Sequence, residues 1–252
     1  MKDNTSSTEI MIKAENISVS FTEKRNGRKV THTVLRELSF EMKQGEILGL
    51  AGESGSGKST LAKTLLGITE LQCGEFTIND KSPQMVFQDP FSALNPAKTI
   101  RFILEEPLKI SGVKDKEERL KKVKDSLLSV GLEEILLERK PAELSGGQRQ
   151  RICIAAALMN NPGLLIADEP VSALDVTVQA QVLALLKKLK EERGFSILFI
   201  SHDLRTMYNF CDRVMILKEG RIAEQGKVEE LYRDPKDPYT KLLLESAGIR
   251  QS

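Results

Sequence analysis

Residues 52–60 read GESGSGKST and fit the spacing of a phosphate-binding loop, GxxxxGK[ST]. Glycines at this spacing let consecutive backbone N–H groups curl around phosphate oxygens. The Lys58 ammonium would reach the β and γ phosphates, and the Ser59 hydroxyl can bind Mg²⁺. The segment therefore predicts a triphosphate site made by Gly52, Glu53, Ser54, Gly55, Ser56, Gly57, Lys58, Ser59 and Thr60.

Two acids, Asp168 and Glu169, follow the apolar run LLIA. Acids that end a buried strand lie at the edge of a parallel sheet where α/β proteins bind their ligands. Asp168 would hold Mg²⁺ through water, and Glu169 would polarise the attacking water as a general base. Two solvated acids opening a loop before Pro170 would give the same pattern, but the phosphate-binding loop favours the catalytic interpretation.

The third chemical feature is LSGGQ, Leu144 to Gln148. Ser145 and Gln148 have the spacing of a capping box, so a helix is expected to begin here with free N–H groups and the positive end of its dipole. A helix N-terminus that opens on Gly146 and Gly147 can bind an anion. The cap alone accounts for Ser145 and Gln148, but it does not require the two glycines.

Strands and helices are expected where these segments need them. Residues 46–51 form a short apolar strand before the phosphate-binding loop, and residues 59–66 form a helix after it. Two continuous apolar runs, 163–168 and 195–201, are typical of strands buried on both faces of a parallel sheet. A helix that ends at Gly194 is expected between them, with apolar residues at Val178, Val182, Leu185 and Leu189. The expected fold class is α/β, with a parallel-sheet core.

Two parts of the chain differ from this core. IMIKAENISVSF and VLRELSFEM, separated by the polar connection TEKRNGRKVTHT, predict a small antiparallel sheet near the N-terminus. Residues 91–161 have helical character, with apolar Leu120, Val123, Leu127 and Leu128 at helical spacing. We therefore expect a flexible tail over 1–9, one domain over 10–245 whose core (10–90 and 162–235) is interrupted by a helical subdomain (91–161), and a short C-terminal extension over 236–252.

Composition excludes several classes of protein. Lys and Arg number 37 against 36 Asp and Glu, a formal net charge of +1, so the chain has no global basic field of the kind that wraps nucleic acid. Cys73, Cys153 and Cys211 contain no CxxC pair, which argues against a disulfide framework or zinc site; we expect them to be buried in a cytosolic protein. The apolar run 152–159 is far shorter than the roughly 20 residues that cross a bilayer, so any membrane role needs other chains.

In their order along the chain, these motifs resemble those of the ATPase subunits of ABC transporters. The chain carries GESGSGKS, VFQDP with Gln88, LSGGQ, LLIADE, SALD with Asp175, and ISHD with His202. The resemblance extends from about Ile12 to Leu244 and implies a P-loop NTPase fold of the ABC type. It also implies that two such domains close head to tail around two ATP molecules. Each ATP would then lie between one partner's phosphate-binding loop and the other partner's LSGGQ helix.

The same resemblance implies roles for single residues. Gln88 would contact Mg²⁺ and the attacking water, His202 would contact the γ-phosphate, and Asp175 would lie in the loop that couples the two sites. Phe21 resembles the aromatic residue that stacks on adenine, although an ordinary core or edge aromatic would look the same. The expected catalytic residues are Glu169, His202 and Gln88; the expected metal ligands are Ser59, Gln88 and Asp168; and the nucleotide contacts add Phe21, Ser145, Gly146, Gly147, Gln148 and Asp175 to the phosphate-binding loop.

VFQDPFSALNP, the segment Glu105–Pro107 and DPKDPYTKLLLES resemble the importer subgroup for oligopeptides, dipeptides and nickel. The chain departs from that subgroup in two places. Only 88 − 58 = 30 positions separate Lys58 from Gln88, which implies a trimmed β-hairpin, and Ala156 stands where the family commonly has an arginine. The end of the chain soon after PYTKLLLES, together with FCDRVMILKEGRI, favours the nickel or metal-chelate members.

The leading hypothesis is an ATP-hydrolysing subunit of a binding-protein-dependent importer for nickel or another metal chelate, with an oligopeptide or dipeptide importer as the alternative. The expected cofactors are ATP and Mg²⁺. The expected partners are a second, paralogous ATPase subunit, two transmembrane permeases and, indirectly, an extracytoplasmic solute-binding protein, but no nucleic acid. The expected location is peripheral, at the cytoplasmic face of the cell membrane.

Two other classes are less well supported by the sequence. Soluble ABC ATPases that act on DNA or ribosomes commonly carry two cassettes or long coiled coils, whereas this chain has one cassette and a near-neutral charge. An ATP-binding interaction module without turnover would not need both Glu169 and His202.

Overall fold

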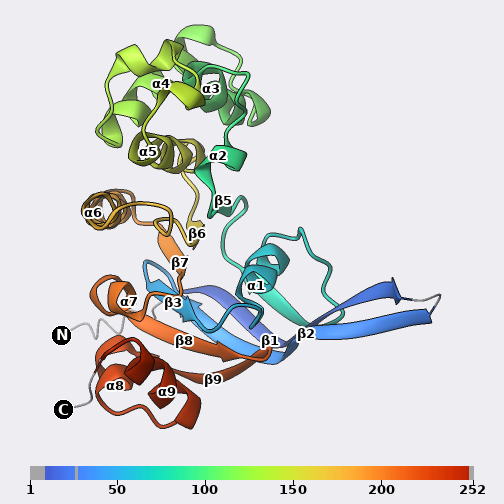
Figure 1. Cartoon of the computed structure of the whole chain (residues 1–252). Coiled ribbons are helices and arrows are strands. Elements are labelled where there is room, and N and C mark those ends of the chain that lie inside the picture. The colour runs from blue at the N-terminus through green and yellow to red at the C-terminus, as the bar shows by residue number, and fades with distance from the viewer. Residues whose placement is uncertain (1–8, 26–27, 250–252) are drawn as a thin grey trace, which may run out of the picture. The chain divides into compact units, whose positions relative to one another are not determined.

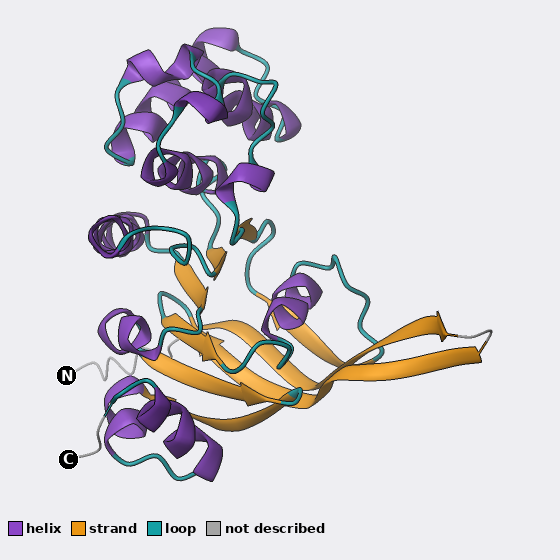
Figure 2. Ribbon diagram, viewed as in Figure 1, coloured by secondary structure: helices purple, strands orange, loops and turns teal. Residues whose placement is uncertain are grey.

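The computed structural model describes residues 9–25 and 28–249, which belong to two compact units. One unit, called here the strand-rich unit, takes its residues from 1–81 and 196–252, and the other, the helical unit, is the continuous segment 82–195. Figure 1 follows the chain by colour, and Figure 2 shows that long strands dominate the first unit and helices the second. Each unit positions a different set of the predicted site residues.

An antiparallel sheet of three strands forms one part of the strand-rich unit. Its order is β2-β1-β4, from β1 (Ile10–Arg25), β2 (Arg28–Lys43) and β4 (Cys73–Ile78), which confirms the predicted sheet. The polar connection predicted between the first two strands was wrong, because pairing continues to Arg25 and Arg28. β-Branched residues such as Thr22 and Thr31, whose hydroxyls lie 3.1 Å apart across the hairpin, favour extended backbone even in a polar segment.

The second group of strands in this unit surrounds β3 (Ile47–Ala51). β3 pairs in parallel with β7 (Ser196–Ile200) on one side and β8 (Arg213–Lys218) on the other, and β9 (Arg221–Lys227) runs antiparallel to β8. Every residue of β3 and β7 is buried, as expected for parallel strands covered on both faces. The predicted parallel α/β core is confirmed here.

The helices of the strand-rich unit are α1 (Lys58–Leu65), α7 (Leu204–Phe210), α8 (Val228–Arg233) and α9 (Pro238–Ser246). The last two are tied to α7 by hydrogen bonds. The Tyr232 hydroxyl donates to the Leu204 carbonyl at 2.8 Å, and Arg205 Nε donates to the Ala247 carbonyl at 2.9 Å. The C-terminal helices therefore belong to the folded body of this unit.

The helical unit carries two short parallel strands, β5 (Gln84–Val86) and β6 (Leu164–Asp168). Helix α5 packs against its neighbours through the fully buried side chains of Ile152 and Ile154. The helices of this unit are α2 (Pro90–Ala93), α3 (Ile100–Ile110), α4 (Lys116–Ser129), α5 (Gly146–Ala157) and α6 (Val176–Arg193), with 3₁₀ turns η1 (Glu134–Glu138) and η2 (Pro141–Glu143).

Five residues expected at buried positions are not fully buried: Leu120, Val178 and Leu185 are half-buried, and Leu128 and Cys73 are exposed. Leu128 on α4 is 56% exposed, and on α6 the buried position is Leu186 rather than Leu185. One step along a helix turns a side chain by about 100°, which is enough to leave the buried stripe. Cys73 is exposed at the start of β4, whereas Cys153 and Cys211 are buried as predicted.

No helix in the described ranges is long and apolar enough to cross a membrane.

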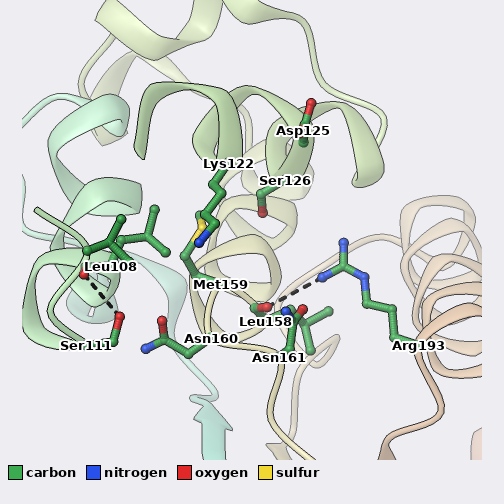
Figure 3. A pocket seen from close by; sticks show the side chains of 11 residues that line it. Leu108, Ser111, Lys122, Asp125, Ser126, Leu158, Met159, Asn160, Asn161 and Arg193 are labelled. Atoms are coloured by element: carbon green, nitrogen blue, oxygen red, sulfur yellow. Dashed lines mark hydrogen bonds between the residues drawn. The ribbon is translucent and has the colours of Figure 1, made fainter. Parts of the chain in front are cut away.

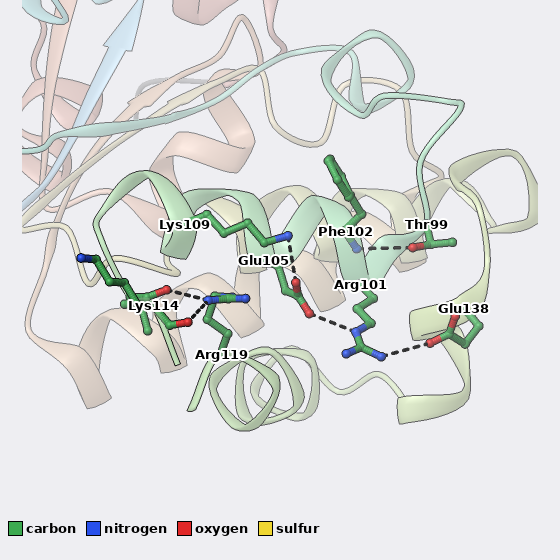
Figure 4. A network of polar contacts seen from close by, with 9 residues as sticks. Thr99, Arg101, Phe102, Glu105, Lys109, Lys114, Arg119 and Glu138 are labelled. Carbon is green, nitrogen blue, oxygen red and sulfur yellow. Dashed lines mark hydrogen bonds and ion pairs between the residues drawn. The ribbon is translucent and has the colours of Figure 1, made fainter. Parts of the chain in front are cut away.

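A network of polar contacts lies along helix α3 of the helical unit. On α3, the Glu105 carboxylate accepts from Arg101 Nε and pairs with Lys109 Nζ, both at 3.0 Å, and Figure 4 shows these residues along one face of the helix. Burial alone would raise the pKa of Glu105, but the bonds from Lys109 and Arg101 outweigh it and hold the pKa below its usual value. The Glu105 carboxyl group is therefore ionised more readily in the folded state than in the unfolded state.

This pKa shift has a predictable effect on stability. A carboxyl whose pKa is lowered by folding stabilises the protein above its unfolded pKa, and that stabilisation is lost as the pH falls through the folded pKa. We expect Glu105→Gln to lower the free energy of unfolding by about 1 kcal/mol at pH 7 and to have a smaller effect near pH 3. Denaturant titrations at the two pH values measure this difference.

The matched control is Glu118→Gln on α4. Glu118 makes an (i, i+4) pair with Lys122, but both side chains are close to half exposed. Its replacement should change stability little at either pH. If Glu105→Gln lowered the free energy of unfolding equally at both pH values, the stabilisation would not come from a lowered pKa of Glu105.

Candidate functional site

The backbone of the phosphate-binding loop requires glycine at its two ends. The loop leaves β3 at Gly52, whose φ is +149°, and enters α1 after Gly57, whose φ is +109°. A Cβ on Gly52 would lie 2.2 Å from the carbonyl oxygen of Leu217, and one on Gly57 would lie 2.6 Å from the side chain of Leu35. Both the positive φ and the close neighbours exclude a side chain at these positions. The predicted strand, loop and helix are therefore present.

Lys58 points back into this loop. Its ammonium donates to the carbonyl oxygens of Gly52 and Glu53, both at 2.8 Å, and the residue is 9% exposed. Ser56 Oγ is buried and has no hydrogen-bond partner in the described part of the chain. A buried hydroxyl without a partner is costly, so a ligand oxygen at this point would be stabilising.

Strand pairing places His202 beside the phosphate-binding loop. Leu50 of β3 and Ile200 of β7 are partners in the parallel register, so Gly52 and His202 both stand two residues beyond a paired position. They leave the same carboxyl edge of the sheet, where α/β proteins bind ligands. The strand-rich unit thus brings His202 to the site that contains Lys58.

Phe21 lies on β1, opposite His32 of β2. Strand β2 passes the phosphate-binding loop two residues later. The carbonyl oxygen of Val34 lies 3.3 Å from the position of a Cβ on Gly57. The Phe21 ring is 43% exposed, so it is not a core aromatic. This exposure leaves a face of the ring for stacking, as the adenine hypothesis needs.

The helical unit brings Gln88 and Glu169 into contact. Val86 of β5 and Ala167 of β6 are partners in parallel register, and each of the two residues stands two positions further on. Gln88 Nε2 donates to Glu169 Oε2 at 3.3 Å. The backbone of Glu169 has a φ of +46°, which is uncommon for a residue with a Cβ and is often found at functional sites.

Asp168 is the last residue of β6 and is 7% exposed, which agrees with the predicted strand end. The loop after Glu169 is held by its own hydrogen bonds. Ser172 Oγ donates to the Glu169 carbonyl at 3.1 Å, and Gln179 Nε2 donates to the carbonyls of Val171 and Leu174. These bonds fix the backbone that carries the two acids.

The LSGGQ segment forms the predicted capping box at the start of α5. Gln148 N–H donates to Ser145 Oγ at 3.3 Å, and Ser145 N–H donates to Gln148 Oε1 at 2.9 Å. Asp175 caps α6 in a similar way, by accepting from Val178 N–H at 3.0 Å. A Cβ on Gly147 would lie 2.7 Å from Val178 Cγ1, so the first turns of α5 and α6 pack closely.

The two signature glycines should therefore differ in their tolerance of alanine. A Cβ on Gly146 meets only Leu174 at 3.4 Å, an ordinary contact, whereas Gly147→Ala forces the stiff Val178 side chain to move. We expect Gly146→Ala to preserve or raise the melting temperature, because alanine favours helix, and Gly147→Ala to lower it by several degrees. Thermal unfolding of both variants tests this, and equal melting temperatures would contradict the packing argument.

ATP and Mg²⁺ are the groups that the resemblance implies, and the residues present fit them. The glycine-lined loop and the unpartnered Ser56 Oγ suit a phosphate chain. Within residues 9–25 and 28–249 no group of three His, Cys, Asp or Glu could hold a metal alone. Mg²⁺ does not need such a group, because it is commonly held by one or two protein oxygens, phosphates and water. In the strand-rich unit Ser59 carries an oxygen of this kind, and in the helical unit Asp168 and the Gln88 amide carry others.

A separate hollow of about 390 Å³ lies in the helical unit, between the C-terminal ends of α3, α5 and α6 and the side chains of Lys122, Asp125 and Ser126 on α4 (Figure 3). Arg193, at its rim, donates to the Leu158 carbonyl at 3.4 Å and to Ser129 Oγ at 2.9 Å. Lys122 is paired with Glu118 at 2.7 Å. The predicted site residues are not among those that line it, so the hollow is separate from the candidate site.

One neighbour of the phosphate-binding loop was not predicted. The hydroxyl of Tyr239, on α9, accepts a hydrogen bond from the N–H of Glu53 at 3.2 Å. The sequence segment PYTKLLLES served only as a mark of subgroup, because 186 residues separate Tyr239 from Glu53 and no spacing rule joins them.

Comparisons with known proteins agree with this geometry. The family described as "ABC transporter" matches residues 35–172. The oligopeptide transport ATP-binding protein OppF of Haemophilus influenzae is 41% identical over an alignment that covers 96% of this chain and 79% of that protein. The oligopeptide transport ATP-binding protein AppF of Bacillus subtilis is 45% identical and covers 84% and 69%.

Solved structures show the same fold. The ATP-binding cassette MJ0796, in a dimeric post-hydrolysis state bound to ADP and Pi, has a TM-score of 0.76 and 32% identity, covering 86% of this chain and 99% of that one. The cbiO1 protein of Clostridium perfringens, part of the ABC transporter complex cbiONQ, has a TM-score of 0.76 and 26% identity, covering 96% of each chain.

These findings confirm the ABC-type P-loop fold and the resemblance to the oligopeptide and dipeptide importer subgroup. The phosphate-binding loop, the LSGGQ helix and the acids that end β6 occur in the predicted structural settings. The chain therefore belongs to the ABC transporter family, as an ATPase of the ATP-binding cassette type.

Proposed function

We propose that this chain hydrolyses ATP to drive the import of oligopeptides or dipeptides through two membrane permeases. The observation that carries the proposal is its identity of 41% over 96% of its length to a protein named for oligopeptide transport. AppF of Bacillus subtilis, which is also named for oligopeptide transport, is 45% identical to this chain. Nickel or a metal chelate is the second candidate, because a solved structure named as a putative metal-chelate type ABC transporter is only 26% identical to this chain.

ATP hydrolysis is assigned to the residues at the carboxyl edges of the strands. Glu169 would take a proton from the attacking water, and its hydrogen bond to Gln88 orients the carboxylate for that task. Lys58 would exchange its bonds to the Gly52 and Glu53 carbonyls for phosphate oxygens, and His202 would contact the γ-phosphate. Bound Mg²⁺, held by Ser59, Gln88 and Asp168, would spread the charge that develops on the phosphates.

The LSGGQ helix is assigned to a second nucleotide. Its first N–H groups, at Gly146 and Gly147, have no acceptor within the helix, and Ser145 beside them is exposed. Such an N-terminus can bind the phosphates of an ATP held by another cassette. The chain would therefore act as one half of a dimer that closes on ATP, with a paralogous ATPase as the other half.

The remaining partners follow from this role. Two permease chains would form the path for the solute, as the resemblance to importer ATPases implies. The ATPase would bind them at the cytoplasmic face of the membrane, and an extracytoplasmic solute-binding protein would deliver the peptide to them. A role on nucleic acid is disfavoured by the near-neutral net charge of +1.

Solute uptake distinguishes the two candidates. Cells that lack this chain would be compared with cells that carry the wild-type chain or the Glu169→Gln chain, using a labelled tripeptide and labelled Ni²⁺ in parallel. The proposal expects peptide uptake only with the wild-type chain and Ni²⁺ uptake that is the same in all three strains. Loss of Ni²⁺ uptake with peptide uptake intact would overturn the peptide assignment and support the metal candidate.

A further inference from the structure

The C-terminal helix α9 reaches the phosphate-binding loop through one side chain. Tyr239, the second residue of α9, accepts the backbone N–H of Glu53 at 3.2 Å. The tyrosine as a whole is 8% exposed. Both residues belong to the strand-rich unit. A part-buried hydrogen bond therefore connects the C-terminal helix to the phosphate-binding loop.

The Glu53 peptide is the point where this contact meets the predicted nucleotide chemistry. Its carbonyl oxygen accepts from Lys58 Nζ at 2.8 Å and from Ser56 N–H at 3.2 Å. Its N–H is the group held by Tyr239. The same residue thus links the hydroxyl of Tyr239 to the lysine that should bind the β and γ phosphates.

Polar contacts restrain both the backbone and the ring of Tyr239. Asp237 caps α9 by accepting from Tyr239 N–H at 2.8 Å, and Glu224 of β9 accepts from Asp237 N–H at 3.1 Å. The Lys218 ammonium lies 4.7 Å from the centre of the tyrosine ring. A side chain with these restraints loses little further freedom when it accepts a hydrogen bond.

The phenol keeps its proton throughout the ordinary pH range. Burial raises the pKa of Tyr239, and the nearby carboxylates of Glu53 and Glu219 raise it further, although the bond from the Glu53 N–H acts in the opposite direction. The hydroxyl therefore remains neutral while it accepts the Glu53 N–H.

The binding of a triphosphate changes which of these bonds can persist. Lys58 has to turn toward phosphate oxygens, so the Glu53 carbonyl loses its ammonium partner. The hydroxyl of Tyr239 approaches Glu53 from α9 and does not depend on the direction of Lys58. This bond can hold the Glu53 peptide when the lysine bond is given up.

From these contacts we propose that Tyr239 is a positioning residue that keeps the phosphate-binding loop in its nucleotide-binding conformation when Lys58 moves to the phosphates. The proposal rests on the assignment of this loop to ATP made under Proposed function. A loop conformation needed equally in the ground state and the transition state affects binding more than turnover.

The test is Tyr239→Phe, which keeps the ring and removes only the hydroxyl. We expect the KM for ATP to rise about fivefold, the effect of one typical hydrogen bond, while kcat changes by less than about twofold. ATP binding measured by titration should weaken by a similar factor. Steady-state hydrolysis at several ATP concentrations separates KM from kcat.

The chain offers a matched control in Tyr232→Phe. Tyr232 is also a buried tyrosine of the C-terminal helices, and its hydroxyl donates to Leu204 of α7 at 2.8 Å, not to the phosphate-binding loop. Tyr232→Phe should lower the melting temperature as much as Tyr239→Phe does, or more, and leave the KM for ATP unchanged. Equal KM values for the wild type and Tyr239→Phe, or an equal rise in KM for both variants, would overturn the proposal.

A second measurement keeps the test open if Tyr239→Phe does not fold. In the wild-type protein with a non-hydrolysable ATP analogue, the Glu53 amide should stay protected from hydrogen exchange. Exchange at the rate of an unstructured amide would contradict the proposal. Absence of ATP hydrolysis by the wild type and Tyr232→Phe, each assembled with the partner ATPase and the permeases, would instead reject the proposed function, so the two failures are distinguishable.

Discussion

Replacement of Glu169 by glutamine should lower the rate of ATP hydrolysis by about 10²- to 10⁴-fold, the usual contribution of a general base. The glutamine keeps the size of the side chain, and its amide oxygen can still accept from Gln88, which donates to Glu169 Oε2 at 3.3 Å in the wild type. The variant should therefore fold and bind ATP with nearly unchanged affinity. Single-turnover hydrolysis and nucleotide titration, measured on the same preparation, test the two parts of this prediction.

Glu37→Gln is the matched control for this experiment. Glu37 is also a glutamate with positive φ, +54° against +46° for Glu169, but it is exposed on β2 and pairs with Arg221. The same substitution there should leave hydrolysis unchanged. A Glu169→Gln protein that hydrolyses ATP at the wild-type rate would remove Glu169 from the catalytic role.

Replacement of Lys58 by alanine should weaken both binding and turnover. The ammonium is the cation of the phosphate-binding loop that is expected at the β and γ phosphates, and hydrogen bonds from charged groups contribute about 1.5–3 kcal/mol. We expect ATP affinity to fall by roughly 10- to 100-fold and hydrolysis to fall by more, because charge on the phosphates increases in the transition state. The loss of binding distinguishes this variant from Glu169→Gln.

The control for Lys58→Ala is Lys63→Ala. Lys63 lies on the same helix, α1, but its side chain is exposed in the last turn. Its replacement should change neither nucleotide affinity nor hydrolysis. An unchanged ATP affinity in Lys58→Ala, with Lys63→Ala behaving as wild type, would contradict the assignment of the loop to phosphates.

Features that depend on a short stretch of sequence were predicted well. The phosphate-binding loop lies between a strand and a helix as its motif implies, and Ser145 and Gln148 form the capping box that their types imply. The contact between Gln88 and Glu169 joins residues that are far apart in the sequence. It follows from the parallel pairing of β5 and β6, which the sequence does not encode in any spacing.

Features that depend on tertiary contacts were missed or misplaced. The polar residues 22–25 and 28–33 form strand because the antiparallel register continues to the pair Arg25 and Arg28, despite their composition. The buried face of α6 includes Leu186 rather than Leu185, which only the packing of the helix decides. Tyr239 was missed because its partner is 186 residues away. The division of the chain into a core over 10–90 and 162–235 with an insertion over 91–161 stays a prediction.

The substrate preference depends on even more distant information. The solute would be selected by permeases and a solute-binding protein, so no residue of this chain need contact it. The leading hypothesis from the sequence was nickel or a metal chelate, whereas two relatives that cover most of the chain are named for oligopeptides. Identity over the whole cassette is the broader observation, and the proposal follows it.

Peptide uptake into sealed membrane vesicles tests the proposed import most directly, with this chain, its partner ATPase and the permeases in the membrane, ATP on the side of the cassettes and the solute-binding protein on the other side. We predict accumulation of a labelled peptide that requires ATP and stops in the Glu169→Gln protein, although that protein still binds ATP. Uptake that continues at the wild-type rate in Glu169→Gln vesicles, or without ATP, would contradict the proposed import.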